Sequence, residues 1–196
     1  MTGVTQSAGV RPRGAGRAQL HETALRLFAH DGVEGTSLQA IADDMGVTKA
    51  AVYYHYRSKD DLVLGVLAPL FEELDAIIDR AAAHRGRAAR LEDFLTGMVT
   101  LIVDHHTRFA VLVKDPYVAR LMEAHHDLVA WWDRIVEQIL GPAPDPLSRT
   151  ALMVFLGGMT GPLSDPSPGA PDIGTLREHL LKCGRRILGL RRRGAA

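Results

Sequence analysis

The spacing of apolar residues constrains the fold of this chain more than any other feature. Apolar side chains recur every three or four residues, and no segment sustains the alternation with period two that a half-buried strand requires. The sequence therefore predicts an all-α protein of about nine helices. These are residues 17–31, a short helix capped by Thr36 that stops at Gly46, a short helix capped by Thr48, and residues 59–84, 91–106, 116–125, 127–140, 147–163 and 172–190.

Composition excludes several classes of protein. Cys183 is the only cysteine, so an internal disulfide is excluded, and we expect this thiol to be a buried small hydrophobic residue. The weakly polar stretch 151–163 is shorter than the roughly 20 apolar residues of a membrane span, and the N-terminus has no apolar segment typical of a secretory signal. We therefore expect a soluble, cytoplasmic protein without membrane partners, cofactors or a metal site.

Charge is balanced in total, with 23 basic and 23 acidic residues, but it is uneven along the chain. We expect a disordered arm over residues 1–16, a helix-turn-helix domain over residues 17–62, and a larger helical domain over residues 63–196. Arg11, Arg13 and Arg17 precede the first acidic residue, a pattern suited to a phosphate backbone and equally to a solvated tail. The arginine-rich C-terminus is interpreted as solubilising.

The most informative segment is residues 36–62, which meets the steric needs of two short helices that cross steeply. Thr36 and Gln39 have the spacing of a capping box, Thr48 caps the next helix, and Ser58 with Asp61 caps a third. Gly46 can adopt the positive φ of the short turn. The apolar residues Ile41, Ala42, Met45, Val47 and Val52 are expected to fill the shared interior.

A second helix held in this way can enter a DNA major groove, where its N-terminal residues meet base edges. Lys49 is the strongest base-reading candidate, because its ammonium can donate to guanine O6 or N7, while Ala50 can contact a thymine methyl. The alternative is a solvated helical hairpin with an aromatic end. The candidate DNA-binding residues are Ser37, Gln39, Thr48, Lys49, Ala50, Tyr53, Tyr54, His55 and Lys59.

Residues of about 17–62 resemble the DNA-binding domain of TetR-family (tetracycline-repressor-like) transcriptional regulators. The resemblance is carried by Leu-Phe-Ala-His-Asp-Gly at the end of the first helix, Thr-Ser-Leu-Gln-Ala-Ile-Ala, Gly-Val-Thr-Lys-Ala-Ala-Val-Tyr-Tyr-His-Tyr and Ser-Lys-Asp-Asp-Leu. It implies a two-fold symmetric dimer on a palindromic operator, with Lys49 and Tyr54 as base readers. Beyond residue 62 it rests on helix number and length alone.

The family layout also implies a ligand cavity inside the C-terminal bundle and a dimer interface built from the last two helices. A plain core is the alternative in both cases. The candidate ligand-binding residues, suited to a small and mostly apolar effector, are Phe94, Met98, Ile102, His105, Phe109, Met122, His125, Trp131, Trp132 and Met153. The candidate dimer residues are Leu152, Phe155, Leu156, Met159, Leu176, Leu180, Cys183 and Ile187.

The expected function is a ligand-responsive, sequence-specific DNA-binding regulator, a repressor released when an effector tilts the helix over residues 59–84. Two alternatives come from other classes. One is a DNA-binding protein that needs no effector. The other is a small histidine-dependent enzyme or metal site using His105 and His125; however, adjacent histidines do not share a helix face, and no catalytic motif is present, so we predict no enzyme.

Overall fold

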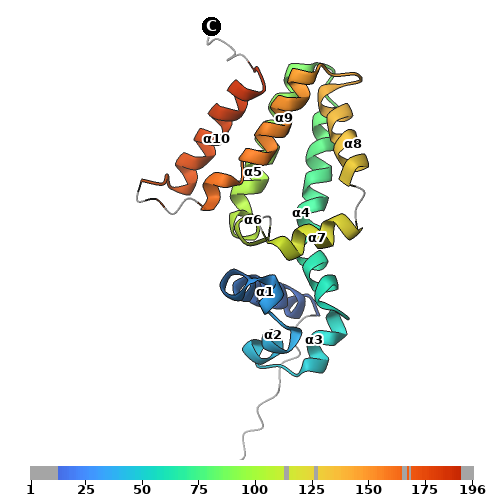
Figure 1. The fold of residues 1–196 in the computed structure, drawn as a ribbon, viewed down its shortest axis with the longest axis vertical. Coiled ribbons are helices and arrows are strands. Elements are labelled where there is room, and N and C mark those ends of the chain that lie inside the picture. The colour runs from blue at the N-terminus through green and yellow to red at the C-terminus, as the bar shows by residue number, and fades with distance from the viewer. Residues whose placement is uncertain (1–12, 113–114, 126–127, 165–166, 168, 191–196) are drawn as a thin grey trace, which may run out of the picture. The chain divides into compact units, whose positions relative to one another are not determined.

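The computed structural model describes residues 13–112, 115–125, 128–164, 167 and 169–190. Ten α-helices and one 3₁₀ helix account for most of these residues, and no strand occurs among them (Figure 1). The all-α prediction is confirmed. The chain divides into two compact units between Val66 and Leu67, four residues beyond the boundary predicted from the sequence, and we describe each unit by itself.

Unit 1 is a cluster of short helices followed by the start of a long one. It contains α1 (Arg13–Gly35), α2 (Leu38–Met45), α3 (Lys49–His55) and the first turns of α4 (Lys59–Ala82). The backbone of α1 kinks at Gly32, whose φ is 73°, where the sequence predicted the helix to end. The predicted arm of residues 1–16 lies outside the described residues as far as residue 12, and its last four residues are helical instead.

Unit 2 holds the remaining part of α4, which continues through Pro69, and the rest of the helices. These are α5 (Arg87–Asp104), α6 (His106–Leu112), α7 (Pro116–His125), α8 (Leu128–Leu140), α9 (Pro146–Gly158), the 3₁₀ helix η1 (Gly161–Ser164) and α10 (Ile173–Ile187). Helix α5 is central, because α8 and α10 both pack against it, and α9 contacts α8 and α10 (Figure 1).

Two helices of unit 2 differ most from the prediction. The helix expected over residues 91–106 begins at Arg87 and ends at Asp104; the next residue, His105, has a ψ of 26°, outside the helical range, and α6 follows at once. His106 Nδ1 donates a hydrogen bond to the Val103 carbonyl oxygen at 3.0 Å, so the imidazole satisfies a backbone carbonyl group next to the end of α5. The helix expected over residues 147–163 ends at Gly158.

The core of unit 2 is built on α5, which buries nine of its residues. Leu91, Phe94, Leu95 and Val99 are each at most 1% exposed. Close packing is visible at Gly97, where an added Cβ would lie 2.7 Å from Cγ2 of Ile77 on α4. The absence of a side chain there lets α4 and α5 approach each other closely.

Candidate nucleic-acid interface

Three local features set the geometry of α2, the turn and α3. Ser37 is the N-cap of α2, and its hydroxyl accepts a hydrogen bond from the Ala40 amide at 3.0 Å. Gly46 ends α2 in the left-handed conformation, with a φ of 65°. Thr48 then caps α3, accepting from the Ala51 amide at 3.3 Å. The roles predicted for Gly46 and Thr48 are confirmed, and the two helices are joined by a minimal turn.

The capping box predicted at Thr36 and Gln39 is wrong by one residue. Thr36 is 2% exposed, and its hydroxyl donates to the Gly32 carbonyl oxygen at 2.8 Å, which ties it to the end of α1. Gln39 donates to the Asp43 carboxylate at 2.7 Å. Because the Thr36 hydroxyl is engaged with the carbonyl four residues earlier, the adjacent serine takes over the cap.

The interior between α2 and α3 is small and apolar. Ile41 and Ala42 are fully buried, and Val52 is 1% exposed. Met45 and Val47, which the sequence placed in the same interior, are only half-buried. An ion pair between Arg26 of α1 and Asp44 of α2 adds a polar link at the surface. The apolar face of α2 therefore carries most of the packing that holds α3 in place.

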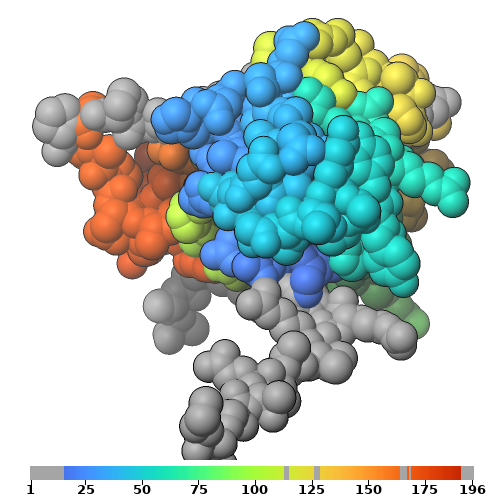
Figure 2. All heavy atoms as spheres, turned by 90° about the horizontal axis from the view of Figure 1, so that it is seen from below, coloured from blue at the N-terminus to red at the C-terminus, as the bar shows by residue number. Residues whose placement is uncertain are grey.

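Helix α3 presents almost its whole surface to solvent. All seven of its residues are described, and Val52 is the only one that is buried. Tyr54 is 83% exposed and Tyr53 is 42% exposed. Figure 2 looks onto this face of unit 1, where α2 and α3 (light blue to cyan) lie at the surface. The exposed candidate residues of this face are Ser37, Gln39, Thr48, Lys49, Ala50, Tyr53, Tyr54 and His55.

Two side-chain pairs order the exposed face of α3. The Lys49 ammonium lies 5.4 Å from the centre of the Tyr53 ring, one helical turn further on. The rings of Tyr54 and His55 meet edge to face, with their centres 5.4 Å apart. The face thus carries a cation and three rings that have hydrogen-bonding atoms, an arrangement suited to phosphate oxygens and base edges.

Lys59 differs from the other candidates because its ammonium is engaged within the protein. It is half-buried, and Nζ donates to the carbonyl oxygens of Val33 at 2.9 Å and Glu34 at 3.0 Å. A cation at this place satisfies carbonyl groups at the C-terminal end of α1. The contact fastens the start of α4 to α1 within unit 1.

Sequence reasoning missed a polar cluster around Tyr56. This tyrosine is 6% exposed, and its hydroxyl accepts from Arg17 Nε at 2.8 Å and lies 2.5 Å from Nε2 of His21. A Cβ added at Gly65 would lie 2.5 Å from the same ring. Tyr56 therefore joins α1, the end of α3 and α4, and Gly65 on the buried side of α4 was the signal available in the sequence.

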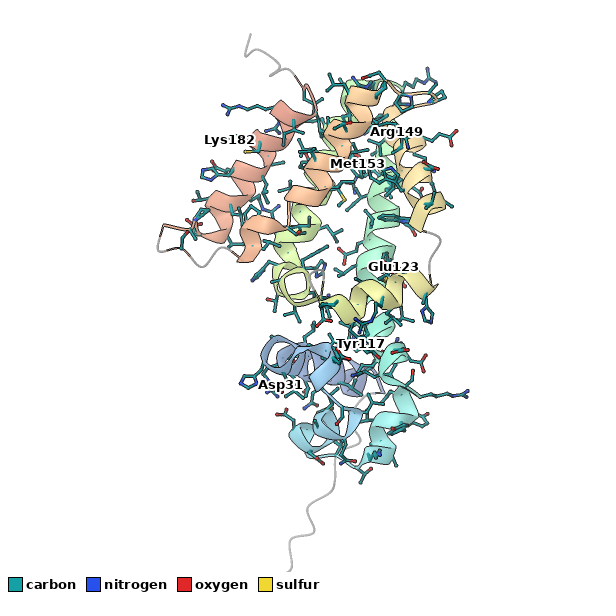
Figure 3. All side chains as sticks on the ribbon, in the orientation of Figure 1. Asp31, Tyr117, Glu123, Arg149, Met153 and Lys182 are labelled. Atoms are coloured by element: carbon teal, nitrogen blue, oxygen red, sulfur yellow. The ribbon has the colours of Figure 1, made fainter. Side chains whose placement is uncertain are left out.

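The ten candidate ligand-binding residues of unit 2 do not gather around one described cavity. Phe94, Met98 and Ile102 are buried in the core on α5. Met153, labelled on α9 in Figure 3, is 57% exposed, and His125 is also exposed. The other five are half-buried: His105, Phe109, Met122, Trp131 and Trp132. Exposure thus separates Met153 and His125 from the rest of the set.

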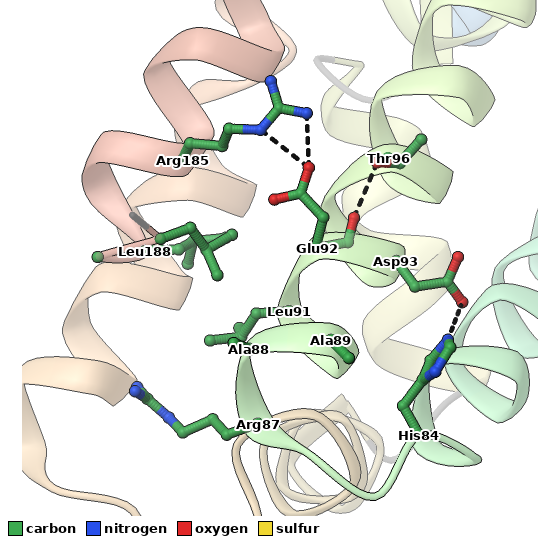
Figure 4. A pocket seen from close by; sticks show the side chains of 12 residues that line it. His84, Arg87, Ala88, Ala89, Leu91, Glu92, Asp93, Thr96, Arg185 and Leu188 are labelled. Carbon is green, nitrogen blue, oxygen red and sulfur yellow. Dashed lines mark hydrogen bonds and ion pairs between the residues drawn. The ribbon is translucent and has the colours of Figure 1, made fainter. Parts of the chain in front are cut away.

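A hollow of unit 2 lies elsewhere, between the start of α5 and the end of α10 (Figure 4). It has a volume of about 1000 Å³ and an apolar floor that includes Leu91 and Leu188. Glu92 accepts from Arg185 at 2.5 Å and 2.8 Å across it, a hydrogen bond that raises the pKa of the guanidinium. Its central charges are therefore matched with each other, and none of the ten candidate ligand-binding residues lines it.

The predicted dimer residues fall into two groups. Five of them are 0–7% exposed within the single chain and belong to its own core, so they are not free surface: Leu152, Phe155, Met159, Leu176 and Leu180. Leu156 is half-buried, and Ile187 is 39% exposed. Cys183 is exposed, so the prediction of a buried thiol is wrong.

The exposed face of α9 carries two large apolar residues that the set of candidate dimer residues left out. Leu147 and Val154 are 78% and 56% exposed, Gly157 and Gly158 follow them at helical spacing, and Gly161 lies beyond the end of the helix as the first residue of η1. A Cβ added at any of these three glycines would meet nothing within 4 Å. We call Leu147, Val154, Gly157, Gly158 and Gly161 the α9 stripe.

The histidines considered as catalytic or metal-binding groups are not clustered. His105 Nε2 lies 2.9 Å from Oε1 of Glu73, and Arg108 donates to its Nδ1 at 3.1 Å. His125 Nδ1 donates to the Leu121 carbonyl oxygen at 3.0 Å. Within the described ranges, no three His, Cys, Asp or Glu side chains are grouped so as to hold a metal ion. No described helix is long and apolar enough to span a membrane.

Comparison with known proteins gives a consistent assignment for unit 1. Residues 20–66 match the family model described as bacterial regulatory proteins, tetR family. The chain is 34% identical over 121 residues to the probable HTH-type transcriptional regulator ArpR of Pseudomonas putida, covering 62% of this chain and 54% of that protein. It is 30% identical over 99 residues to the HTH-type transcriptional repressor KstR2 of Mycobacterium tuberculosis, covering 48% of each.

Solved structures extend the likeness of fold to nearly the whole chain. The TetR family transcriptional regulator PfmR of Thermus thermophilus superposes with a TM-score of 0.63 at 20% identity, over 87% of this chain and 97% of that one. Mycobacterium tuberculosis KstR2 gives 0.63 at 20% identity, over 93% and 96%. The matches to the curated relatives span about half their length. Taken with the geometry of α2 and α3, these findings show that residues 20–66 form a domain of the tetR family of bacterial regulatory proteins, and that the rest of the chain shares the fold of the solved regulators.

Proposed function

We propose that this protein is a ligand-responsive transcriptional repressor that binds a palindromic operator as a homodimer. The observation that carries the proposal is the exposure of α3, which buries Val52 alone among its seven described residues and leaves Lys49, Tyr53 and Tyr54 on an open face. A helix that is fixed through a single side chain and preceded by a capped minimal turn matches the recognition helix of a helix-turn-helix.

Roles within the face follow from position and chemistry. Lys49 is the first residue of α3 and reads a base edge, while Ala50 beside it contacts a thymine methyl. Tyr54, which is more exposed than Tyr53, adds a second base contact. Tyr53 and His55 reach phosphate oxygens, which fix the register of the helix on the duplex.

The effector proposed here is a small, mostly apolar molecule held in unit 2. Half-buried Phe109, Met122, Trp131 and Trp132 supply aromatic and thioether surface of the kind that lines such sites. Two relatives whose names state a ligand point the same way. One is the nicotine-responsive repressor HdnoR of Paenarthrobacter nicotinovorans, 36% identical over 78 residues, and another is the ketosteroid regulator KstR2. Release from the operator needs only a few kcal/mol of differential affinity.

The proposed dimer face is the α9 stripe together with the exposed side of α10. The three glycines of the stripe have free space in the single chain, so their small size is explained when a second backbone approaches them. Ile187 and Cys183 extend the face along α10. Two copies pairing α9 and α10 form a four-helix bundle around a two-fold axis.

The test is selection of bound duplexes from a random library at moderate salt, with the wild-type protein and with Lys49→Ala. We expect a palindrome from the wild type. The Lys49→Ala selection should lose preference at one position in each half-site while keeping the rest of the motif. A wild-type selection with no enriched motif would refute sequence-specific regulation.

A further inference from the structure

The recognition helix contains an ordered contact between two of its exposed side chains. The Lys49 ammonium lies 5.4 Å from the centre of the Tyr53 ring. The two residues are four apart in α3, so they share one face of the helix. Tyr53 is 42% exposed, and its neighbour Tyr54 packs its ring against His55 instead. Tyr53 therefore restricts where the Lys49 ammonium lies before any DNA is present.

Restricting the side-chain conformation matters more for lysine than for most residues. Its four-carbon stem has many rotamers, and their loss on binding opposes affinity. A ring at cation–π distance favours the rotamers that keep the ammonium over that face, which lowers the entropy cost of making one defined contact. A lysine that is already oriented discriminates between bases better than one that can move to a nearby phosphate.

We propose that Tyr53 is a positioning residue for base readout, and that its ring holds Lys49 for the base edge that Lys49 recognises. This inference rests on the proposed function, in which Lys49 is a base reader. It adds that the ring of Tyr53 sets the preference at one base pair, while the hydroxyl of Tyr53 serves the phosphate backbone equally at every sequence.

The two parts of Tyr53 can be separated by substitution. Tyr53→Phe keeps the ring beneath the ammonium and removes the hydroxyl. Tyr53→Leu removes the ring and keeps an apolar side chain that favours helix. Because Tyr53 is exposed, both variants should fold, which circular dichroism checks. Tyr54→Leu is the comparison variant: as a base reader Tyr54 contributes to affinity, but its ring packs against His55 and not Lys49, so its loss should leave discrimination at the Lys49 base pair unchanged.

The experiment measures binding to the selected operator and to the same operator substituted at the base pair that Lys49→Ala relaxes. The ratio of the two affinities is the discrimination. Tyr53→Leu should lower it about two- to five-fold, the range expected for an exposed cation–π contact. Tyr53→Phe should lower the affinities for both operators by the same factor and leave their ratio unchanged. In the Lys49→Ala background, Tyr53→Leu should not change the ratio.

The outcomes distinguish this inference from the proposed function. If the wild type selects no motif, the proposed function fails and the inference fails with it. If a motif appears but Tyr53→Leu keeps full discrimination, only the inference is overturned. An equal loss of discrimination with Tyr54→Leu would also overturn it, because the effect would then belong to the aromatic face as a whole. If Lys49→Ala weakens all sequences equally, Lys49 has no base preference for Tyr53 to set, and the inference is again overturned.

Discussion

Replacing Lys59 tests how unit 1 is held together. In Lys59→Met the hydrogen bonds from Nζ to the Val33 and Glu34 carbonyl oxygens, 2.9 Å and 3.0 Å long, are lost. A hydrogen bond from a charged donor contributes about 1.5–3 kcal/mol when well buried, and a cation at a helix C-terminus adds about 0.3–1 kcal/mol. Because Lys59 is half exposed, solvent screening reduces both of these contributions. We expect a loss of about 1–2 kcal/mol in the free energy of unfolding of unit 1.

Urea unfolding followed by far-UV circular dichroism measures this loss. With a denaturant slope of about 1–3 kcal/mol/M, the midpoint of unit 1 should fall by roughly 0.3–2 M. Fluorescence provides an internal reference, because the only two tryptophans, Trp131 and Trp132, lie in unit 2. Hydrogen exchange should accelerate at the end of α1 and the start of α4 before it does elsewhere.

Lys49→Met is the matched control, because it removes the same charge from an exposed residue of the same unit. Its effect on stability should stay within about 0.5–1 kcal/mol, the range of the Tyr53 contact that it loses. In Lys59→Met the slope of log affinity against log salt concentration should stay unchanged, because Lys59 is engaged with α1. A lost phosphate contact would reduce that slope by about one. An unchanged midpoint for Lys59→Met, with a reduced salt slope, would show that Lys59 serves DNA and not α1.

Three further predictions concern unit 2. The pKa of Asp172 is lowered in the folded protein, first by the Thr175 amide that its carboxylate caps. The stability that the ionised carboxylate contributes is therefore complete above the unfolded pKa of about 3.8 and is lost as pH falls through the lower pKa of the folded state. Asp172→Asn should flatten the acid side of a plot of thermal midpoint against pH. Gly184→Ala should destabilise unit 2 by about 1–3 kcal/mol in urea unfolding, because a Cβ there would clash with Leu95 and Phe155; equal stability would show that α10 shifts freely. Val154→Glu should yield monomers in analytical ultracentrifugation with the helical circular dichroism intact, whereas a remaining dimer would place the interface elsewhere.

Local features of unit 1 were predictable from the sequence because they depend on neighbouring residues. The left-handed Gly46 and the caps at Thr48 and Ser58 involve side chains within three residues of the groups they satisfy. The cap of α2 was misplaced because the Thr36 hydroxyl has a competing acceptor, the Gly32 carbonyl four residues earlier, and the capping pattern does not show which partner it takes. The cluster around Tyr56 was missed because its partners Arg17 and His21 lie 39 and 35 residues away in the sequence.

Unit 2 was less predictable because helical spacing identifies an apolar stripe and not what covers it. Leu152 and Phe155 share such a stripe and were assigned to a partner, but the chain buries them itself. In the sequence, nothing distinguishes the glycines of α9, which face open space, from Gly184, which is tightly packed. Distinguishing an internal core from an interface or a cavity requires the packing of α5, α9 and α10.

The central claim is that two copies of α3 read one symmetric site, and the mass of the protein–DNA complex tests it most directly. On a selected operator, sedimentation equilibrium should give two chains per duplex. Insertion of about five base pairs, half a helical turn, between the half-sites rotates one half-site to the opposite side of the helix, so this change should reduce binding to the level of a single half-site. One chain per duplex, or full affinity after the insertion, would contradict the account.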